Sequence, residues 1–278
     1  MTARARVLDY AFLVAGLWLA WVLVFQWAGP EALSPPADTL QRMGEYLTSA
    51  QFWPHAAATG LAFAYACVVA LVGGLLLGLA LGANRLAGEV GEPILSSLYS
   101  IPKITLYPVI LLVFGLGVSA KVAFGALHGI FPVALFAIGA LKNTSPVLIK
   151  TARVLRLAPV ETARTVLLPA ALPEIVTGLR IGFSATLLGT LIGELFASDQ
   201  GLGFMLIRAM EAHKVLDIMA LTLLLFAFAA SANALLLRRR AARAPPVSAA
   251  AFAGHPISSG ADRNRKRWSG MRGPSRID

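Results

Sequence analysis

The stretch RTVLLPAALPEIVTGLR, Arg164–Arg180, decides how this chain folds. Two prolines stand four residues apart in an apolar run that has arginine at both ends. Proline removes a backbone hydrogen bond from a helix interior, so we expect the segment to be too interrupted for a membrane span. It is also too apolar for an ordinary loop. Because long apolar stretches lie on both sides, the segment should connect two membrane helices.

The composition is that of a membrane protein. Of the 278 residues, 57% are hydrophobic and 14% are charged, whereas a soluble domain is about half apolar and a quarter charged. The net charge of +10 is concentrated at one end, because residues 238–278 hold ten Lys or Arg and two Asp or Glu. This distribution indicates a basic tail and gives no support to a nucleic-acid partner. The single cysteine, Cys67, excludes an intrachain disulfide.

Six apolar stretches predict an all-α integral membrane protein. A bilayer core about 30 Å thick needs roughly 20 apolar residues in a helix, and no alternating pattern supports membrane strands. The predicted spans are Leu8–Trp27, Ala56–Ala83, Ile94–Gly117, Val122–Leu141, Val176–Ala197 and Val215–Leu237. The first is too long for the apolar region of a signal peptide and carries tryptophans, which favours a retained span over a cleaved signal.

Basic residues near the span ends predict the orientation. Residues 28–55 contain one arginine and three acids, whereas residues 142–175 contain five basic residues, and three arginines follow the last span. This pattern places both termini and residues 142–175 in the cytoplasm. The predicted organisation is a first helix with an external segment (1–55), a five-helix core (56–240) and a disordered basic tail (241–278).

Glycines recur at helical spacing in two of the spans. They are Gly74, Gly78, Gly82, Gly178, Gly182, Gly189 and Gly193. Small residues at this spacing let membrane helices approach closely. Packing within one chain is the simpler interpretation, and a subunit interface is the alternative.

A helical hairpin is predicted in the basic connection. Ser145 suits an N-cap and Pro146 the first helical position, and the helix that follows has an apolar face and a basic face. Pro159 opens a second helix with Glu161 in its first turn, where a carboxylate favours the helix dipole. We expect Pro169 to end that helix and Pro173 to restart the chain into the fifth span. Such a hairpin either rests on the membrane surface or docks a cytoplasmic partner.

The hairpin resembles the EAA loop of ABC importer permeases. That pattern is Glu-Ala-Ala, three residues, Gly, nine residues, Ile, any residue, Leu-Pro. Laid from residue 150 to residue 169, it matches at Ala152, Leu168 and Pro169, and Val166 is a mild change. The departures are Lys150, Thr151 and Arg156. Glycine adopts a left-handed conformation at a helix end more readily than arginine, so either the turn is shaped differently here or the partner is adapted to a more basic surface.

Three further stretches resemble permeases of the nitrate/sulfonate/taurine type, and the likeness covers roughly residues 61–237. They are SIPKITLYPVILLVFGLGVSAKV (100–122), LPAALPEIVTGLRIG (168–182) and GELFASDQGLGFMLIRAME (193–211). The resemblance implies a type I ABC importer permease fold, with six transmembrane helices and cytoplasmic coupling helices, in a bacterial inner membrane.

The resemblance also implies the partners and the mechanism. A separate cytoplasmic subunit hydrolyses ATP, and the chain itself has no GxxxxGK[ST] phosphate-binding motif. An external solute-binding protein delivers the solute, which is a small organic or inorganic anion such as a sulfonate or nitrate. Two copies form the pathway, so we expect a homodimer without enzyme activity or a cofactor of its own. An ion-gradient-driven secondary transporter or channel is the main alternative, and the few titratable groups in the spans count against it.

The resemblance places the ATPase-coupling contacts in the hairpin. These residues are Lys150, Arg153, Arg156, Leu157, Ala158, Glu161, Val166, Leu168 and Pro169.

Charged residues within spans are costly and indicate a pathway or a paired structural role. Pro102 and Lys103 either line a cavity on the translocation path, where the proline breaks the helix, or Lys103 extends to the membrane surface. We expect Glu194 to meet solvent or the binding protein, as Asp199, Arg208 and Glu211 would. Two further residues have structural predictions: Arg180 should extend to the membrane surface, and His128 should make a satisfied polar contact.

Overall fold

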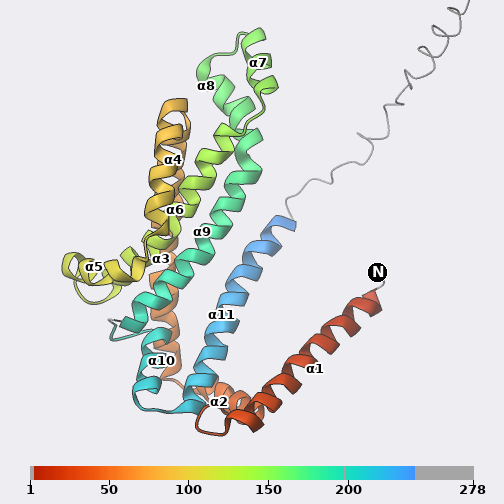
Figure 1. Cartoon of the computed structure of the whole chain (residues 1–278), viewed down its shortest axis with the longest axis vertical. Helices are drawn as coiled ribbons and strands as arrows, with labels where there is room; N and C mark the ends of the chain where they lie inside the picture. Colours follow the sequence, from red (N-terminus) through yellow and green to blue (C-terminus); the bar gives the residue numbers. More distant parts are fainter. Residues whose placement is uncertain (1–2, 197, 242–278) are drawn as a thin grey trace, which may run out of the picture. The chain divides into compact units, whose positions relative to one another are not determined.

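A computed structural model describes residues 3–196 and 198–241, which form helices and turns and contain no β-strand. Of these, residues 3–196 and 198–236 form one compact unit. Of the predicted disordered tail (241–278), residues 242–278 lie outside the described part. The helices, in chain order (Figure 1), are α1 (Ala3–Ala28), α2 (Pro36–Thr48), α3 (Phe52–Gly82), α4 (Arg85–Ser100), η1 (Lys103–Leu106), α5 (Tyr107–Phe114), α6 (Val118–Lys142), α7 (Pro146–Val154), α8 (Pro159–Thr162), η2 (Ala163–Leu167), α9 (Leu168–Phe196), α10 (Leu202–Glu211) and α11 (Val215–Ala241).

The all-α membrane architecture is confirmed. Five helices of the described residues are long and apolar enough to cross a membrane, within α1, α3, α6, α8–α9 and α11. The predicted third span, Ile94–Gly117, is instead a broken pair, because α4 and the helix that begins at Lys103 meet at an angle of 83°. Pro102 lies between them. Counting this pair as one span gives the predicted number of six.

The prediction that Pro169 ends the hairpin and that Pro173 restarts the chain is wrong. Helical structure is continuous from Val160 to Phe196, over 37 residues. A π-helical turn, η2, precedes α9, so that the N–H of Leu168 bonds to the carbonyl of Ala163. Pro169 lies two residues after η2, inside this continuous helix and not at a free helix end. Pro173 is accommodated inside the helix, as membrane helices often allow.

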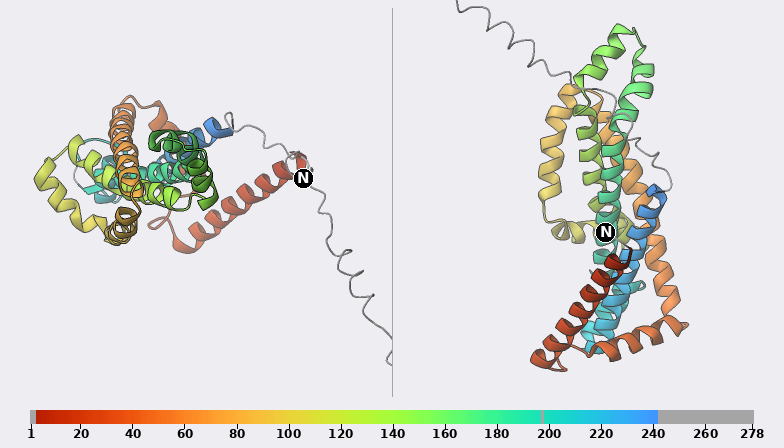
Figure 2. Two further views of the ribbon diagram at one scale, coloured as in Figure 1. Left: turned by 90° about the horizontal axis from the view of Figure 1, so that it is seen from above. Right: turned by 90° about the vertical axis from the view of Figure 1, so that its right-hand side faces the viewer.

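The core is built by α3, α6 and α9, which pack along one another (Figures 1 and 2). The spaced glycines lie at these contacts, which confirms packing within one chain. A Cβ at Gly78 would lie 2.6 Å from the carbonyl oxygen of Ala134, and one at Gly182 would lie 2.2 Å from a methyl carbon of Val133. Side chains at these positions would force the helices apart.

The two ends of this core carry different elements. The hairpin, defined as α7, α8 and η2 (residues 146–167), projects beyond one end of α6 and α9 (Figure 1). At the other end, α10 packs between α3 and α11 through Leu202 and Ala209, which contact Phe52, Leu221 and Leu224.

Candidate functional site

The hairpin forms where the sequence predicts it. The Ser145 side chain accepts a hydrogen bond from the N–H of Val147 and caps α7, and Pro146 follows at the first helical position. Ala152 is buried, and it marks the side of α7 that faces the rest of the chain. Glu161 lies in the first turn of α8, as predicted.

Arg156 adopts the left-handed conformation that a glycine would favour, with φ of +51°. The N–H of Leu157 bonds to the carbonyl of Ala152 at 3.1 Å, and the N–H of Arg156 bonds to that of Arg153 at 3.0 Å. These two bonds are the Schellman arrangement that ends helices. Of the two alternatives, the structure contradicts a differently shaped turn, because the arginine adopts the conformation that the missing glycine would favour.

Most of the predicted coupling residues lie on the surface of the hairpin and of the first turn of α9. Leu157 and Val166 are half-buried, and the exposed members are Lys150, Arg153, Arg156, Ala158, Glu161, Leu168 and Pro169. Apolar side chains beside them are also exposed, with Val154 at 81% and Leu155 at 64%. The apolar face predicted for α7 is thus left largely uncovered by this chain.

The helix break at Pro102 is stabilised by Lys103. Its ammonium group donates a 2.7 Å hydrogen bond to the carbonyl of Tyr99, at the end of α4. The same group lies 4.3 Å from the centre of the Tyr99 ring and 5.7 Å from that of Phe131. Lys103 is half-buried, and Pro102 and the apolar residues that follow are mostly exposed. The side chain therefore satisfies a carbonyl group that the break leaves free.

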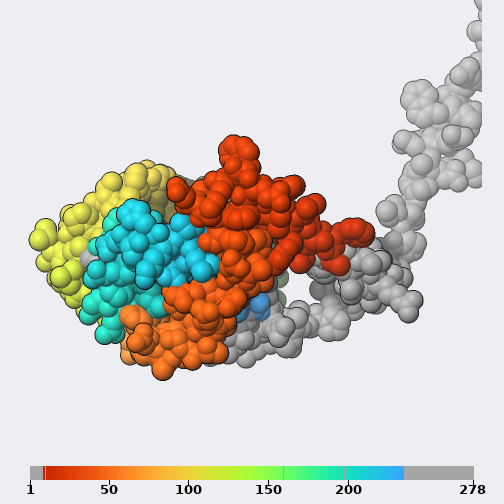
Figure 3. All heavy atoms as spheres, turned by 90° about the horizontal axis from the view of Figure 1, so that it is seen from below, coloured from red at the N-terminus to blue at the C-terminus, as the bar shows by residue number. Residues whose placement is uncertain are grey.

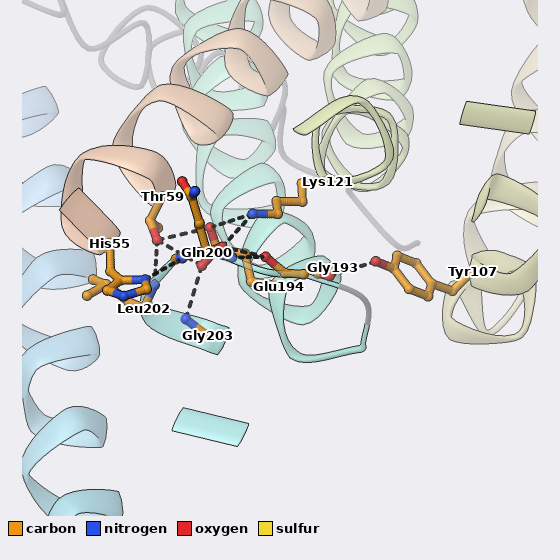
Figure 4. A network of polar contacts seen from close by, with 11 residues as sticks. His55, Thr59, Tyr107, Lys121, Gly193, Glu194, Gln200, Leu202 and Gly203 are labelled. Atoms are coloured by element: carbon orange, nitrogen blue, oxygen red, sulfur yellow. Dashed lines mark hydrogen bonds and ion pairs between the residues drawn. The ribbon is translucent and has the colours of Figure 1, made fainter. Parts of the chain in front are cut away.

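Glu194 is fully buried, so the expectation that it meets solvent or a partner is wrong. Its carboxylate accepts hydrogen bonds from the Thr59 hydroxyl at 2.8 and 3.0 Å and from the N–H of Gly203 at 3.0 Å. The ammonium group of Lys121 lies 4.0 Å away. Figure 4 shows these groups, from α3, α6, α9 and the start of α10, converging on one point. By contrast, Asp199, Arg208 and Glu211 are exposed, as predicted.

Sequence reasoning missed Lys121. The residue lies just before the predicted fourth span, where a lysine normally extends to water, yet its exposure is only 1%. Its ammonium group donates a 2.5 Å hydrogen bond to the carbonyl of Gln200. The available signal was its place three residues after Val118, between two apolar stretches and directly before the predicted span. A charge at that depth requires a partner of opposite charge.

Three further polar side chains lie on α5, α6 and α9. The Tyr107 hydroxyl, at the start of α5, donates a 2.6 Å hydrogen bond to the carbonyl of Gly193. His128 makes the predicted polar contact, with Nδ1 2.9 Å from the carbonyl oxygen of Phe124. Arg180 is exposed on α9.

An ion pair joins α2 to the start of α11. Arg42 Nε lies 2.6 Å from Asp217 Oδ1 and Nη1 lies 2.8 Å from Glu45. The hydrogen bond to Asp217, and then that to Glu45, raise the pKa of Arg42 above its usual range. Tyr46 lies beside them, where burial and then the charge of Asp217 raise the pKa of its hydroxyl.

A cavity of about 320 Å³ lies between α9 and α11. Its lining is mostly apolar, including Phe183, Leu187 and Phe226, and two polar side chains, Ser184 and Asn233, contribute to it. It offers no cationic group to a small anion. Within residues 3–196 and 198–241, no group of three His, Cys, Asp or Glu side chains is placed to share a metal ion.

Comparison with known proteins identifies a common family for most of this chain. The family described as binding-protein-dependent transport system inner membrane component matches residues 70–243. A probable ABC transporter permease protein of Haemophilus influenzae is 30% identical over 224 residues, which cover 80% of this chain and 90% of that protein. The taurine transport system permease protein of Escherichia coli is 30% identical over 215 residues, 75% of this chain and 78% of that protein. A putative aliphatic sulfonates transport permease protein of Bacillus subtilis is 30% identical over 138 residues, half of each chain.

Proposed function

Because this chain belongs to the family of inner membrane components of binding-protein-dependent transport systems, we propose that it forms the translocation path of an ATP-driven importer and couples that path to a separate ATPase. The chain is a multi-pass membrane permease, and its relatives are transport permeases without enzyme activity. The proposal assigns the ATPase contact to the hairpin and the solute path to the region around Pro102.

The observation that carries this proposal is the hairpin. Its exposed surface combines basic side chains with uncovered apolar ones, among them Val154 and Leu155. Uncovered apolar surface beside polar groups is typical of a protein–protein contact. The hairpin also continues directly into α9, so a force applied there would reach the core. A hairpin that only rests on lipid would not need this continuity.

The proposed contact residues follow the resemblance to the EAA loop. They are Lys150, Arg153, Arg156, Leu157, Ala158, Glu161, Val166, Leu168 and Pro169. Arg156 and Glu161 are the charged members closest to the turn between α7 and α8, and both are exposed. Since exposed charges guide association more than they stabilise the fold, replacing them should affect coupling with little effect on folding.

We place this protein in the inner membrane of a bacterial cell. The hairpin and both termini would then lie in the cytoplasm. The excess of basic residues in 142–175 and after α11 supports this orientation. In this orientation α10 and α2 face outward, where the solute-binding protein would dock.

A homodimer accounts for the exposed break between α4 and α5. Irregular backbone at membrane depth is tolerated only where protein covers it or where it lines an aqueous cavity. Much of α5 is exposed in this chain, with Leu112 at 86% and Val113 at 70%. A second copy beside α4 and α5 would cover this surface and place the path between the subunits, close to Pro102 and Lys103.

The proposed solute is a small organic or inorganic anion, such as a sulfonate or nitrate. The names of the taurine and sulfonate permeases among the relatives support this class. Lys103 would supply a cation beside the path, although its ammonium group is held by Tyr99. The substitution Lys103→Met tests the assignment, and unchanged affinity and rate of uptake would remove Lys103 from the path.

Co-purification tests the proposed function directly. A tagged permease should recover the ATPase subunit encoded with it, and uptake by vesicles should require ATP and the solute-binding protein. Replacement of Glu161 by Ala should leave insertion intact and uncouple ATP hydrolysis from uptake. Solute accumulation without any ATPase subunit would contradict the proposal and favour a secondary transporter.

A further inference from the structure

The N-terminus of α10 is held by other helices. The first N–H groups of a helix have no partner within it, and the residue that precedes α10, Gly201, has no side chain to cap them. The N–H of Gly201 bonds to His55 Nδ1 at 3.1 Å, and that of Leu202 to the Thr59 hydroxyl oxygen at 2.8 Å. The N–H of Gly203 bonds to the Glu194 carboxylate. Two residues of α3 and one of α9 therefore cap α10.

Burying the Glu194 carboxylate, which caps α10, costs free energy that its polar partners offset. Glu194 and Lys121 are 0% and 1% exposed, and burying charges is unfavourable unless they are paired and hydrogen-bonded. The Thr59 hydroxyl serves both sides, because it donates to Glu194 and accepts from Leu202. A fully satisfied buried network of this kind has one favourable arrangement.

Two glycines allow the close approach. A Cβ at Gly201 would lie 2.3 Å from the carboxyl carbon of Glu194, and one at Gly203 would lie 2.6 Å from Glu194 Cβ. Gly201 also has φ of +124°, a conformation that other residues rarely adopt. The backbone of this segment is therefore shaped around the Glu194 side chain.

The helix that carries Glu194 begins at the hairpin. Helical structure runs without interruption from Val160, in α8, to Phe196, two residues beyond Glu194. We propose that Glu194, Thr59 and Lys121 form a latch that joins α10 to this helix, so that α10 moves together with the hairpin. This inference rests on the proposed function, in which the hairpin receives the ATPase.

The latch gives α10 a role in communication between the two partners. Seen from its own end of the molecule, α10 is exposed between α5 and α2 (Figure 3). Arg208, Met210 and Glu211 are exposed on it and available to the external solute-binding protein. When that protein pushes on α10, the displacement passes through the latch to α9 and the hairpin. The three latch residues act as positioning residues and do not touch the solute.

Hydrogen exchange tests the latch without any transport assay. In the purified full-length chain, the amides of Leu202 and Gly203 should exchange slowly. Glu194→Gln and Thr59→Val should each accelerate this exchange by roughly 10-fold to 100-fold, because a buried pair or hydrogen bond is broken. Thr59→Ser keeps the hydroxyl and Glu211→Gln removes an exposed charge from the same helix, and both should exchange at the wild-type rate. Wild-type exchange in Glu194→Gln and Thr59→Val would overturn the latch.

ATP hydrolysis tests the communication. In the importer reconstituted with its ATPase, Thr59→Val should keep the basal rate and lower the stimulation by the loaded solute-binding protein to about one-tenth or less. A variant that was merely unstable would lose basal and stimulated rates together. Retained stimulation despite faster exchange would overturn the communication. If wild-type chain recruits no ATPase, the proposed function fails, and the exchange experiment still decides the latch.

Discussion

The two ends of the helical run from Val160 to Phe196 lie in contrasting surroundings. At the hairpin end, Val154 and Leu155 are exposed and few side chains of the hairpin are buried. At the α10 end, Glu194 is completely enclosed and hydrogen-bonded to groups from α3 and α10. One end is left open for a partner, and the other is fastened within the chain.

The difference shows how one long helix can connect an exposed surface, available to a partner, to a buried attachment within the same chain. A partner bound to an exposed surface can shift its position at little cost in free energy. A buried ionic network, by contrast, loses several interactions at once when its members move apart. Motion at the hairpin is therefore expected to be transmitted along α9 and not absorbed at its far end. The following predictions test the contrast between these ends.

The largest effect is expected at the buried end. Lys121→Met should leave the carboxylate of Glu194 without its neutralising charge and destabilise the fold by about 3–5 kcal/mol. Thermal unfolding in detergent measures the loss. The matched control is Arg208→Met, which removes an exposed cation from α10 and should cost at most about 0.5 kcal/mol. Equal losses of stability in the two variants would mean that the buried Lys121 contributes no more to the stability of the fold than an exposed cation does.

A smaller effect is expected at the hairpin. Leu155→Asp should weaken the complex with the ATPase by roughly 10-fold to 100-fold, because it introduces a charge into an apolar contact, and should leave the stability of the permease unchanged. Titration of the purified subunits gives the affinity. Leu86→Asp changes a leucine that is 70% exposed at the start of α4, outside the hairpin, and should retain wild-type affinity. Loss of affinity in both variants would contradict a contact restricted to the hairpin.

Arg156→Gly should stabilise the turn of the hairpin by about 0.5–1 kcal/mol. The gain arises because glycine adopts the left-handed conformation at φ of +51° without the clash of a side chain. Hydrogen exchange of the Leu157 amide, which bonds to Ala152, should slow by about two- to fivefold. Exchange that accelerates in Arg156→Gly would show that the arginine side chain itself holds the turn.

The smallest effect concerns pH at the α10 end. Burial raises the pKa of Tyr46 above its usual value, so the folded state keeps the proton to higher pH than the unfolded state does. The associated stability is complete below the unfolded pKa of about 10 and decreases as pH rises toward the folded pKa. Tyr46→Phe, with Arg42 unchanged, should reduce the loss of stability at alkaline pH by a few tenths of a kcal/mol. An unchanged slope between about pH 9 and 11 would exclude Tyr46 as its source.

Much of the fold was predictable because it depends on local signals. Apolar length set the spans, Ser145 and Pro146 set the start of α7, and Pro102 set the break before Lys103. The spaced glycines predicted close helix packing, since their effect depends mainly on the absence of a side chain. The continuity of the helix through Pro169 was not predictable, because it depends on the π-helical turn η2 that precedes it.

The candidate site divides in the same way. The coupling residues were assigned through the resemblance to the EAA loop, and the structure shows that most of them are exposed. The burial of Glu194 was predicted wrongly and Lys121 was missed, because each residue is near a span end, where a charged side chain can normally reach water. Only the approach of α3 and α10 removes that water.

The amino-acid sequence by itself determined the membrane location, the helix content and the place of the hairpin, because apolar length, proline and capping residues act within a few turns of helix. The tertiary structure alone decided that Glu194, Lys121 and Thr59 meet and that α10 is capped by its neighbours. These features depend on groups far apart in the chain, whose energies of burial and pairing exist only once the helices have packed.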